Sequence, residues 1–218
     1  MDWHEWHDRY DRPDSSLGRR LRVIQKWIGR TLDSAEPGEL RVVSLCAGRA
    51  LDVLGVLPEH PRRHDVRVRL VELDERNALI ARRAASDHGL HGVEVVVGDA
   101  ALTDHYHGMV PADLVLLCGV LGNISDGDVA SAIAYCTQLC ATGATLIWTR
   151  HRKPPDLVPQ ICRWLETGGF EQLWLSEPDA GFGVGVHRHV KPPRPLASGH
   201  RMFTFVGYDA LHQGAHTT

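Results

Sequence analysis

The stretch "VVSLCAGRALDVLGVL", residues 42–57, has the pattern of a buried strand that turns into a helix. Its first residues are mostly apolar and β-branched, as in a strand covered on both faces of a sheet. The turn that follows contains one glycine, Gly48, and residues 51–57 then predict a short helix that Pro58 ends. Such a turn either cradles a nucleotide or connects two core elements, and the rest of the chain decides between these alternatives.

The same alternation of strand and helix continues along the chain. Helices are predicted after most strands, one of them capped by Asp74 and another by Ser125. This alternation predicts a parallel sheet with helices on both faces, which is a three-layer α/β sandwich. The strands of its parallel part are predicted at residues 40–46, 66–73, 93–97, 112–118 and 144–149.

The last part of the chain has strands without helices between them. Residues 170–177 and 201–208 are predicted strands, and the long loop between them is rich in Gly, Pro and basic residues. A short strand at 183–190 is an alternative within that loop. Strands joined without a crossover helix run antiparallel, so we expect a mostly parallel, seven-stranded sheet with one antiparallel strand at its C-terminal end.

The N-terminal part differs from the rest. A serine, Ser15 or Ser16, can cap a helix with one apolar stripe, and before it "WHEWHDRYDRP" combines aromatic residues and histidines in a polar arm. We therefore predict three parts: an N-terminal helical arm or lid over residues 1–38, a single domain over 39–210 and a tail over 211–218.

Composition fits one soluble globular domain. The chain has 218 residues, of which 43% are hydrophobic and 23% charged, and no apolar run nears the ~20 residues that cross a bilayer. The first residues are polar and acidic, unlike a secretion signal, so we expect a cytoplasmic protein with no membrane partner. The formal charge of -3 disfavours a nucleic-acid partner, although residues 62–69 and 150–153 are locally basic.

Cysteine and histidine usage argues against a metal site. The chain's 5 cysteines lie in apolar segments without a CxxC pair, which indicates reduced, buried side chains. It has 14 histidines, but their close pairs lack the cysteine or carboxylate companions of a structural metal site. We therefore predict no bound metal.

The residues that follow the first four strands point to a nucleotide-like ligand. In an open parallel sheet the ligand lies beyond the carboxyl ends of the central strands, and here these ends read "CAGRA", "VELD", "GDA" and "CGVLGN". A glycine lets a ligand approach the backbone, an acid about 20 residues later accepts ribose hydroxyls, and an acid after the third strand can receive an adenine amine. Gly48, Glu72 and Asp99 occupy these three positions.

On these residues and the terminal antiparallel strand, the chain resembles the class I S-adenosylmethionine-dependent methyltransferases over residues 40–208. The resemblance implies a Rossmann-like fold in which Gly48 is the central glycine of the family's first motif. Ser44, Cys46 and Ala50 then stand where that motif usually has an acid and two flanking glycines. Small side chains keep this turn possible but lack the tolerance of glycine for a positive φ.

The resemblance also implies S-adenosylmethionine as the cofactor. Glu72 would bind the ribose, and Asp99 would contact the adenine amine with Ala100 against the ring. The cofactor-binding residues expected on this basis are Cys46, Ala47, Gly48, Asp52, Glu72, Leu73, Asp99, Ala100, Cys118 and Gly119.

Three residues around this site have a second interpretation. Asp52 either replaces the missing acid at the methionine amine or is a first-turn acid favoured by the helix dipole. Asp74 is a helix cap, or it touches the adenine edge. Cys118 lacks the preceding residue typical of enzymes that attack cytosine through a thiolate, which favours simple packing in the core.

The methyl acceptor is expected to be a small molecule with an oxygen, nitrogen or carbon nucleophile. An acceptor that is protonated at neutral pH needs a base, and histidine is the natural supplier. The candidate catalytic residues are His151, His7 and Tyr10. The candidate substrate-binding residues are Asn123, which alternatively caps a turn, Arg150, which can pair with a carboxylate, Trp3 and His187.

Two other functions share parts of this pattern. An NAD(P)-dependent oxidoreductase would share the sheet and the acid Glu72, but it predicts a G-x-G-x-x-G turn, which "AGRALD" lacks. An RNA-directed or non-catalytic S-adenosylmethionine-binding protein would show a coherent basic face around residues 62–69 and 192–201. The chain is expected to act as a monomer or homodimer.

Overall fold

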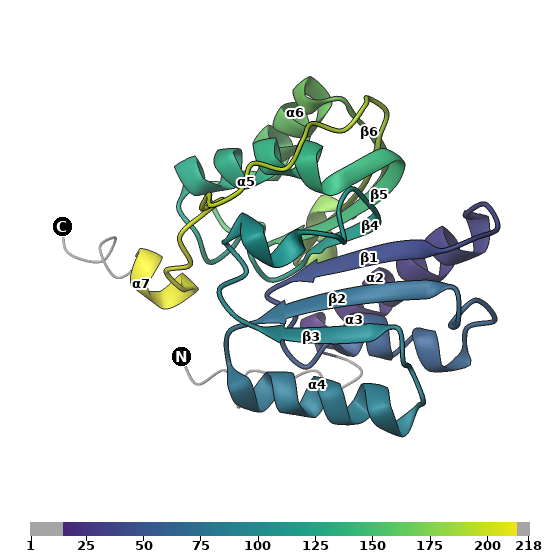
Figure 1. Cartoon of the computed structure of the whole chain (residues 1–218). Helices are drawn as coiled ribbons and strands as arrows, with labels where there is room; N and C mark the ends of the chain where they lie inside the picture. The colour runs from purple at the N-terminus through teal and green to yellow at the C-terminus, as the bar shows by residue number, and fades with distance from the viewer. Residues whose placement is uncertain (1–14, 213–218) are drawn as a thin grey trace.

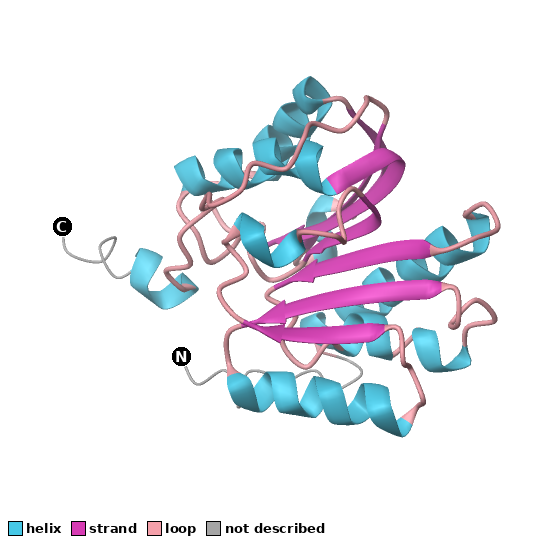
Figure 2. Ribbon diagram, in the orientation of Figure 1, coloured by secondary structure: helices cyan, strands magenta, loops and turns pink. Residues whose placement is uncertain are grey.

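A computed structural model describes residues 15–212 of the chain. Within these residues, one sheet has the strand order β3-β2-β1-β4-β5-β7-β6 and carries helices on both faces (Figures 1 and 2). The strands are β1 (Leu40–Leu45), β2 (Val66–Glu72), β3 (Val93–Val97), β4 (Ala112–Leu117), β5 (Cys140–Arg150), β6 (Phe170–Leu175) and β7 (Gly183–His189). The helices are α2 (Ser16–Ser34), α3 (Leu51–Leu54), α4 (Glu75–Asp87), α5 (Asp126–Leu139), α6 (Val158–Gly168) and α7 (Tyr208–His212).

The pairing of the strands confirms the predicted fold class. β1 pairs in parallel with both β2 and β4. The pairs β2–β3 and β4–β5 are also parallel, whereas β7 runs antiparallel to β5 and β6. The sheet is therefore mostly parallel with one antiparallel strand from the C-terminal part. The chain order reverses between β1 and β4, and ligands bind open sheets at the carboxyl ends of such a strand pair.

The antiparallel strand lies elsewhere than the sequence pattern favoured. The predicted strand at 201–208 is wrong, because this segment is a loop that has only an isolated bridge from Arg201 to Leu102. The alternative at 183–190 is confirmed as β7, where Gly185 lies against the Trp148 ring and leaves no room for a side chain. Two of the apolar residues that suggested a strand at 201–208, Met202 and Phe203, are buried in the core instead.

Two buried cores lie on the two faces of the sheet. α2, α3 and α4 cover one face and α5 and α6 the other (Figure 1). The stripe of α2 is confirmed, since Ile24, Ile28 and Leu32 are each at most 3% exposed and belong to the same core as β1 and β2. Among residues 15–212, no helix is both long and apolar enough to cross a membrane.

The predicted helix caps are also confirmed. Ser15, Asp74 and Ser125 each accept backbone N–H groups from the first turn of the helix that follows them. Asp74 makes a further contact with the Arg76 side chain, and chiefly for this reason its pKa is lowered to about 2. Asp74 is therefore the N-cap of α4, as one of its two interpretations predicted.

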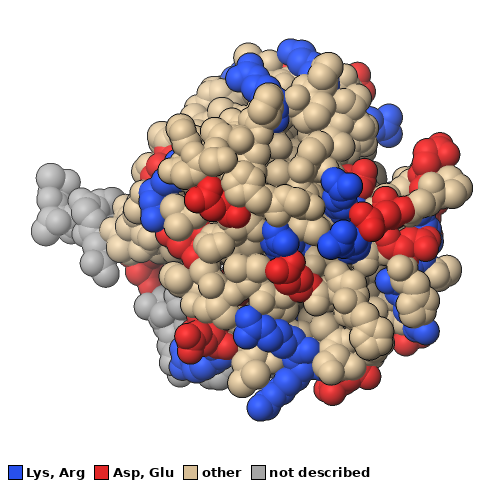
Figure 3. Space-filling view, viewed as in Figure 1, with Lys and Arg blue, Asp and Glu red and all other residues tan. Residues whose placement is uncertain are grey.

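The basic stretch at residues 62–69 forms no coherent basic face. Arg67 lies 3.9 Å from Glu39, and Arg69 forms an ion pair with Glu94 at 2.7 Å. On the side of the molecule drawn in Figure 3, basic and acidic side chains are interspersed. The cations of this stretch are thus balanced locally by acids of neighbouring strands and loops.

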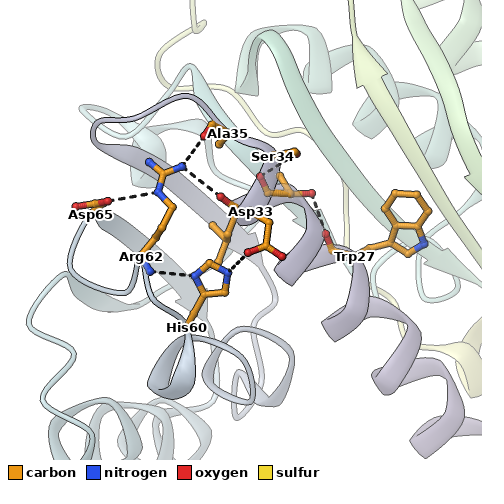
Figure 4. Close-up of polar contacts among 9 residues, drawn as sticks. Trp27, Asp33, Ser34, Ala35, His60, Arg62 and Asp65 are labelled. Atoms are coloured by element: carbon orange, nitrogen blue, oxygen red, sulfur yellow. Dashed lines mark hydrogen bonds and ion pairs between the residues drawn. The ribbon is translucent and has the colours of Figure 1, made fainter.

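Arg62 has a structural role at the far end of α2 (Figure 4). Its guanidinium donates hydrogen bonds of 2.8 to 3.2 Å to the carbonyl oxygens of Leu32, Ala35, Glu36 and Gly38. The last carbonyls of a helix have no partner within the helix, so this arginine satisfies groups that would otherwise need water. It ties the C-terminal end of α2 to the loop before β2.

His60 reinforces this anchor. Its Nε2 atom lies 3.2 Å from Asp33 Oδ1, and its Nδ1 atom accepts a hydrogen bond from the Arg62 backbone at 3.2 Å (Figure 4). The anchor sits where β1 and β2 begin, at the opposite edge of the sheet from the strand ends expected to bind a ligand.

Candidate functional site

The loop after β1 has an unusual backbone. Cys46, Gly48 and Ala50 have φ values of +51°, +57° and +54°, so three alternate residues adopt the left-handed region. Cys46 and Ala50 hold it without glycine, at a cost of roughly 1–2 kcal/mol for each residue. The turn thus has the geometry that flanking glycines favour, although the sequence supplies side chains there.

Glu72 joins this loop to the end of β2. Its Oε2 atom accepts a hydrogen bond from the Gly48 N–H at 2.7 Å, and its Oε1 atom accepts one from the Asp74 N–H at 2.9 Å. The residue is 9% exposed. A carboxylate held by two backbone donors at neighbouring strand ends has a fixed orientation, as recognition of a diol requires.

Asp99 follows β3 and is fixed from two sides. Its Oδ1 atom accepts a hydrogen bond from the Ala101 N–H at 3.0 Å, and its Oδ2 atom accepts one from Arg201 Nη1 at 2.7 Å. Arg201 comes from the segment after β7, which also pairs its backbone with Ala101 through Met202. The sequence offered no sign of this ion pair, because its partners are 102 positions apart.

These strand ends enclose one cavity of about 420 Å³, which we call the first cavity. All ten residues predicted to bind the cofactor line it, including Gly48, Glu72 and Asp99. Its volume lies in the range of small-molecule sites. The structure therefore brings the predicted residues together around a space for a ligand, whereas their binding of a cofactor stays a prediction.

Two of the other residues that line the first cavity come from distant parts of the chain. Arg20 comes from the N-terminal half of α2, and Phe205 from the segment after β7. Sequence reasoning missed both. The stripe on α2 identified its apolar face without showing that the neighbouring arginine borders a ligand site, and Phe205 falls in the segment predicted as a strand.

Asp52 is the buried acid of the first cavity. Burial raises its pKa to about 6, while hydrogen bonds from the backbone and the nearby Arg20 charge act in the opposite direction. Its Oδ1 atom accepts a hydrogen bond from the Val53 N–H at 2.8 Å. It is both a first-turn acid and a cavity residue, so the two interpretations of Asp52 are compatible.

The two cysteines of the first cavity are poor nucleophiles. Burial raises the pKa of both Cys46 and Cys118, and the charges of Glu72 and Asp99 raise that of Cys46 further. Both side chains are therefore neutral thiols at neutral pH. This favours the packing interpretation of Cys118.

A second cavity of about 390 Å³ adjoins the first. The two share Arg20 and Gly119, so their contents would be neighbours. Three predicted residues line the second cavity, namely Asn123, Arg150 and His151. Tyr208 and Lys153 also line it, and both were missed by sequence reasoning.

Asn123 ties the C-terminal segment to the loop after β4. Its side chain donates to the Gly119 carbonyl at 2.6 Å and accepts from the Tyr208 N–H at 2.9 Å. Its backbone carbonyl accepts from Val206 and Gly207. Its amide is thus engaged within the protein, which favours a positioning role.

Arg150 lines the second cavity with its charge already balanced. Its Nη2 atom contacts Asp126 Oδ1 at 3.1 Å, and its Nη1 atom donates to the carbonyl oxygen of Leu121. Arg150 thus has a carboxylate partner at the start of α5, and its contact with a substrate carboxylate stays a prediction.

His151 lies at the second cavity beside an aromatic ring. Its imidazole packs edge-on against the Tyr208 ring at 5.2 Å, and its Nδ1 atom accepts a hydrogen bond from the Lys153 N–H at 3.3 Å. The Lys153 ammonium contacts the Tyr208 hydroxyl at 2.8 Å. These three residues form one wall where β5 ends.

His187 lines neither of the two cavities, so the structure gives no support to its predicted contact with substrate. It is 1% exposed in β7, and its Nδ1 atom accepts a hydrogen bond from Trp148 Nε1 at 3.2 Å. Burial lowers its pKa to about 4, so the ring is neutral at physiological pH. The antiparallel strand turns this side chain into the core. The other candidates, Trp3, His7 and Tyr10, lie outside the described residues.

Comparisons with known proteins identify the fold. No protein-family model matches the sequence, and no curated protein matches it significantly. The solved CurJ carbon methyltransferase is similar with a TM-score of 0.66 at 15% identity, over 82% of this chain and 56% of that chain. An O-methyltransferase family protein from Burkholderia thailandensis is similar with a TM-score of 0.62 at 17% identity, over 84% of this chain and 57% of that chain.

An rRNA methylase from Streptococcus thermophilus is also similar, with a TM-score of 0.58 at 15% identity over 76% of this chain and 95% of that chain. This chain thus spans little more than half the length of the first two structures and nearly the whole of the third. The chain has the Rossmann-like fold of class I S-adenosylmethionine-dependent methyltransferases, as the resemblance implied.

Proposed function

We propose that this protein transfers a methyl group from S-adenosylmethionine to a small molecule. The observation that carries the proposal is the gathering of Gly48, Glu72 and Asp99, distant in sequence, around one cavity that adjoins a second. A methyl donor and its acceptor must lie side by side for an in-line displacement, and two adjoining cavities meet this requirement.

The residues of the first cavity fit the chemistry of the cofactor. Glu72 offers a fixed carboxylate to ribose hydroxyls, and Leu73, which is 68% exposed, offers an apolar surface beside it for an adenine ring. Asp99 borders the same end of the cavity as Ala100. Burying the exposed Leu73 side chain under a flat ring is favourable in itself.

The amino-acid end of the cofactor fits a different pair of residues. Asp52 can receive an ammonium group, and the nearby Arg20 can receive a carboxylate. Ser44 stands where the family has its acid, and its side chain is buried within β1. Asp52 replaces that acid from the following helix, α3.

Bound S-adenosylmethionine supplies an electrophilic methyl group on sulfur. The protein's own contribution is to hold donor and acceptor in contact near Gly119, which borders both cavities, and to exclude water from the contact. His151 Nδ1 accepts a backbone hydrogen bond, so the neutral ring carries its proton on Nε2. His151 is the residue proposed to contact the acceptor at this wall of the second cavity.

The strand order argues against a nicotinamide-dependent oxidoreductase. Dinucleotide-binding folds have the order 3-2-1-4-5-6, whereas here β7 is inserted antiparallel between β5 and β6. An RNA substrate is disfavoured because Arg67 and Arg69 pair with acids and Arg62 caps a helix. A small-molecule acceptor matches the size of the second cavity.

Calorimetric titration of the full chain with S-adenosylmethionine, S-adenosylhomocysteine and NADH tests the proposal. We expect the first two to bind and NADH to give no heat of binding. Glu72→Gln should weaken S-adenosylmethionine binding at least about tenfold, because a hydrogen-bonded charge contributes on the order of 1.5–3 kcal/mol. Glu171→Gln, an exposed change on the distant strand β6, is the matched control.

Because Glu72 also holds the Gly48 loop, each variant is checked by thermal unfolding in the absence of ligand. Asp99→Asn provides a second test that leaves this loop contact intact. Tight binding of NADH, or full affinity for S-adenosylmethionine in both variants, would show that the assignment is wrong.

A further inference from the structure

The two cavities have opposite charge. The first is lined by four acids, Asp52, Glu72, Asp74 and Asp99, against two arginines, Arg20 and Arg49. The second is lined by three cations, Arg20, Arg150 and Lys153, against one acid, Asp209. Potentials from such linings attract ligands of the opposite sign. The first cavity suits a cationic sulfonium compound, and the second suits an anion.

The cations of the second cavity are not equivalent. The Arg150 charge is balanced by Asp126 at 3.1 Å. The Lys153 ammonium contacts the Tyr208 hydroxyl at 2.8 Å and lies 4.5 Å from the centre of its ring, and both of these groups are neutral. Among residues 15–212, Lys153 forms no ion pair with an acid. A ligand in the second cavity can therefore neutralise the charge of Lys153.

The rest of the lining suits a flat molecule. His151, Phe182 and Tyr208 contribute rings to the second cavity, while Gly119 and Gly122 leave its wall without bulky side chains. Its volume of about 390 Å³ lies at the lower end of small-molecule sites, which favours an acceptor of one or two rings. Aromatic groups pack favourably against such rings in edge-on or offset arrangements.

The chemistry of transfer is consistent with this lining. An acceptor that enters as an anion keeps its charge near Lys153, at the wall that His151 and Tyr208 also form. Lys153 is exposed, so its charge contributes to the binding of an anion by the modest amount that is typical of a surface ion pair. A lining of this kind disfavours a cationic amine as the acceptor.

We infer that the second cavity binds a small aromatic carboxylate as the methyl acceptor and that Lys153 is the contact for its anionic group. The inference rests on the proposed function, because it treats the neighbouring cavity as the donor site. It adds the substrate class, which neither the fold nor the motif supplies.

The test uses the full chain saturated with S-adenosylhomocysteine, so that no turnover occurs. Three carboxylates, 4-hydroxybenzoate, anthranilate and indole-3-acetate, are titrated by calorimetry, each against its neutral amide. We expect at least one carboxylate to bind about two- to fivefold more tightly than its amide, the size expected of a partly exposed ion pair. Raising the salt from about 50 to about 500 mM should narrow the difference through screening.

The variant Lys153→Met keeps the apolar stem of the side chain and removes its charge. It should abolish the preference for the carboxylate and leave the affinity for the amide and for S-adenosylhomocysteine unchanged. The matched control is Lys191→Met, whose stem packs against Gly169 far from both cavities. This control should retain the preference.

The outcomes separate the two claims. If S-adenosylhomocysteine binds but every carboxylate binds no better than its amide, the inference is wrong and the proposed function stands. A carboxylate preference that survives in Lys153→Met also overturns the assignment of the contact. If S-adenosylhomocysteine itself fails to bind, the proposed function is wrong.

Discussion

The two ends of α2 are built in opposite ways. At its C-terminal end, Arg62 satisfies four backbone carbonyls, and His60 contacts Asp33 beside it. At its N-terminal end, Arg20 borders two open cavities. The C-terminal end of α2 makes its polar contacts with other residues of the protein, whereas the N-terminal end places Arg20 where a ligand can contact it. The comparison shows how one helix is held rigid from outside the site that it helps to form.

Removing Arg62 from the anchor at the C-terminal end of α2 should have the largest effect on the free energy of unfolding. Arg62→Ala leaves several carbonyls without their donor and should lower the free energy of unfolding by roughly 2–3 kcal/mol, measured by urea denaturation. Arg67→Ala, which removes only a 3.9 Å contact between exposed side chains, should change it by less than about 0.5 kcal/mol. Equal losses in the two variants would show that the Arg62 contacts do not hold the helix end.

The pH dependence of ligand binding tests the first cavity, which the N-terminal end of α2 borders. With the Asp52 pKa raised to about 6, its carboxylate forms as the pH rises through that value, and an ammonium partner is then held. The affinity for S-adenosylmethionine should rise about tenfold between about pH 5 and about pH 7. In Asp52→Asn the affinity should stay low across this range. An unchanged pH profile in the variant would mean that another group controls it.

The same shift predicts an opposite effect on stability without ligand. The pKa of Asp52 is higher in the folded than in the unfolded chain, so between about pH 4 and about pH 6 the folded state binds more protons. The contribution of Asp52 to stability is therefore present at low pH and is lost as the pH rises through about 6. Thermal unfolding of Asp52→Asn beside the wild type isolates this contribution, which should be absent from the variant.

The loop after β1, whose alternate residues have positive φ, predicts a smaller effect on stability. Ala50→Gly relieves an unfavourable φ, so it should leave the free energy of unfolding unchanged or raise it by up to about 1 kcal/mol. The same substitution on the exposed face of α5, Ala134→Gly, should lower it by about 1 kcal/mol. Equal losses at the two positions would show that the loop is not strained.

The smallest effect is expected at the ion pair between Asp99 and Arg201. Both side chains are partly exposed, so Arg201→Ala should reduce stability by at most about 1 kcal/mol. Nucleoside binding, measured by titration with adenosine, should change less than threefold, a factor below 1 kcal/mol. A larger loss would mean that Arg201 itself positions Asp99 for the ligand.

The sequence predicted the parallel part of the fold because its signals are local. Apolar runs, caps such as Asp74 and the alternation of strand and helix are short-range patterns, and the structure confirms them. The antiparallel strand was placed wrongly because Met202 and Phe203 are apolar for a different reason. They pack into the core from a loop, and periodicity does not distinguish that from a strand.

Those residues of the candidate site that directly follow parallel strands were predictable in the same way. Glu72 and Asp99 follow strands, and the topology brings the ends of parallel strands together. The burial of His187 could not be predicted, because the direction of a side chain depends on the register of β7, which a sequence alone does not give. Arg20 and Tyr208 were missed because they come from a helix and a loop that meet the strand ends only in three dimensions.

The segment from His200 to Tyr208 pairs its backbone with Thr103 and Ala101 at one end and with Asn123 at the other. Phe205 borders the first cavity and Tyr208 the second. A single piece of chain is thus a shared wall of both compartments. Any ligand that stiffens this wall from one side prepares it for a ligand on the other, and the two binding equilibria become linked reciprocally.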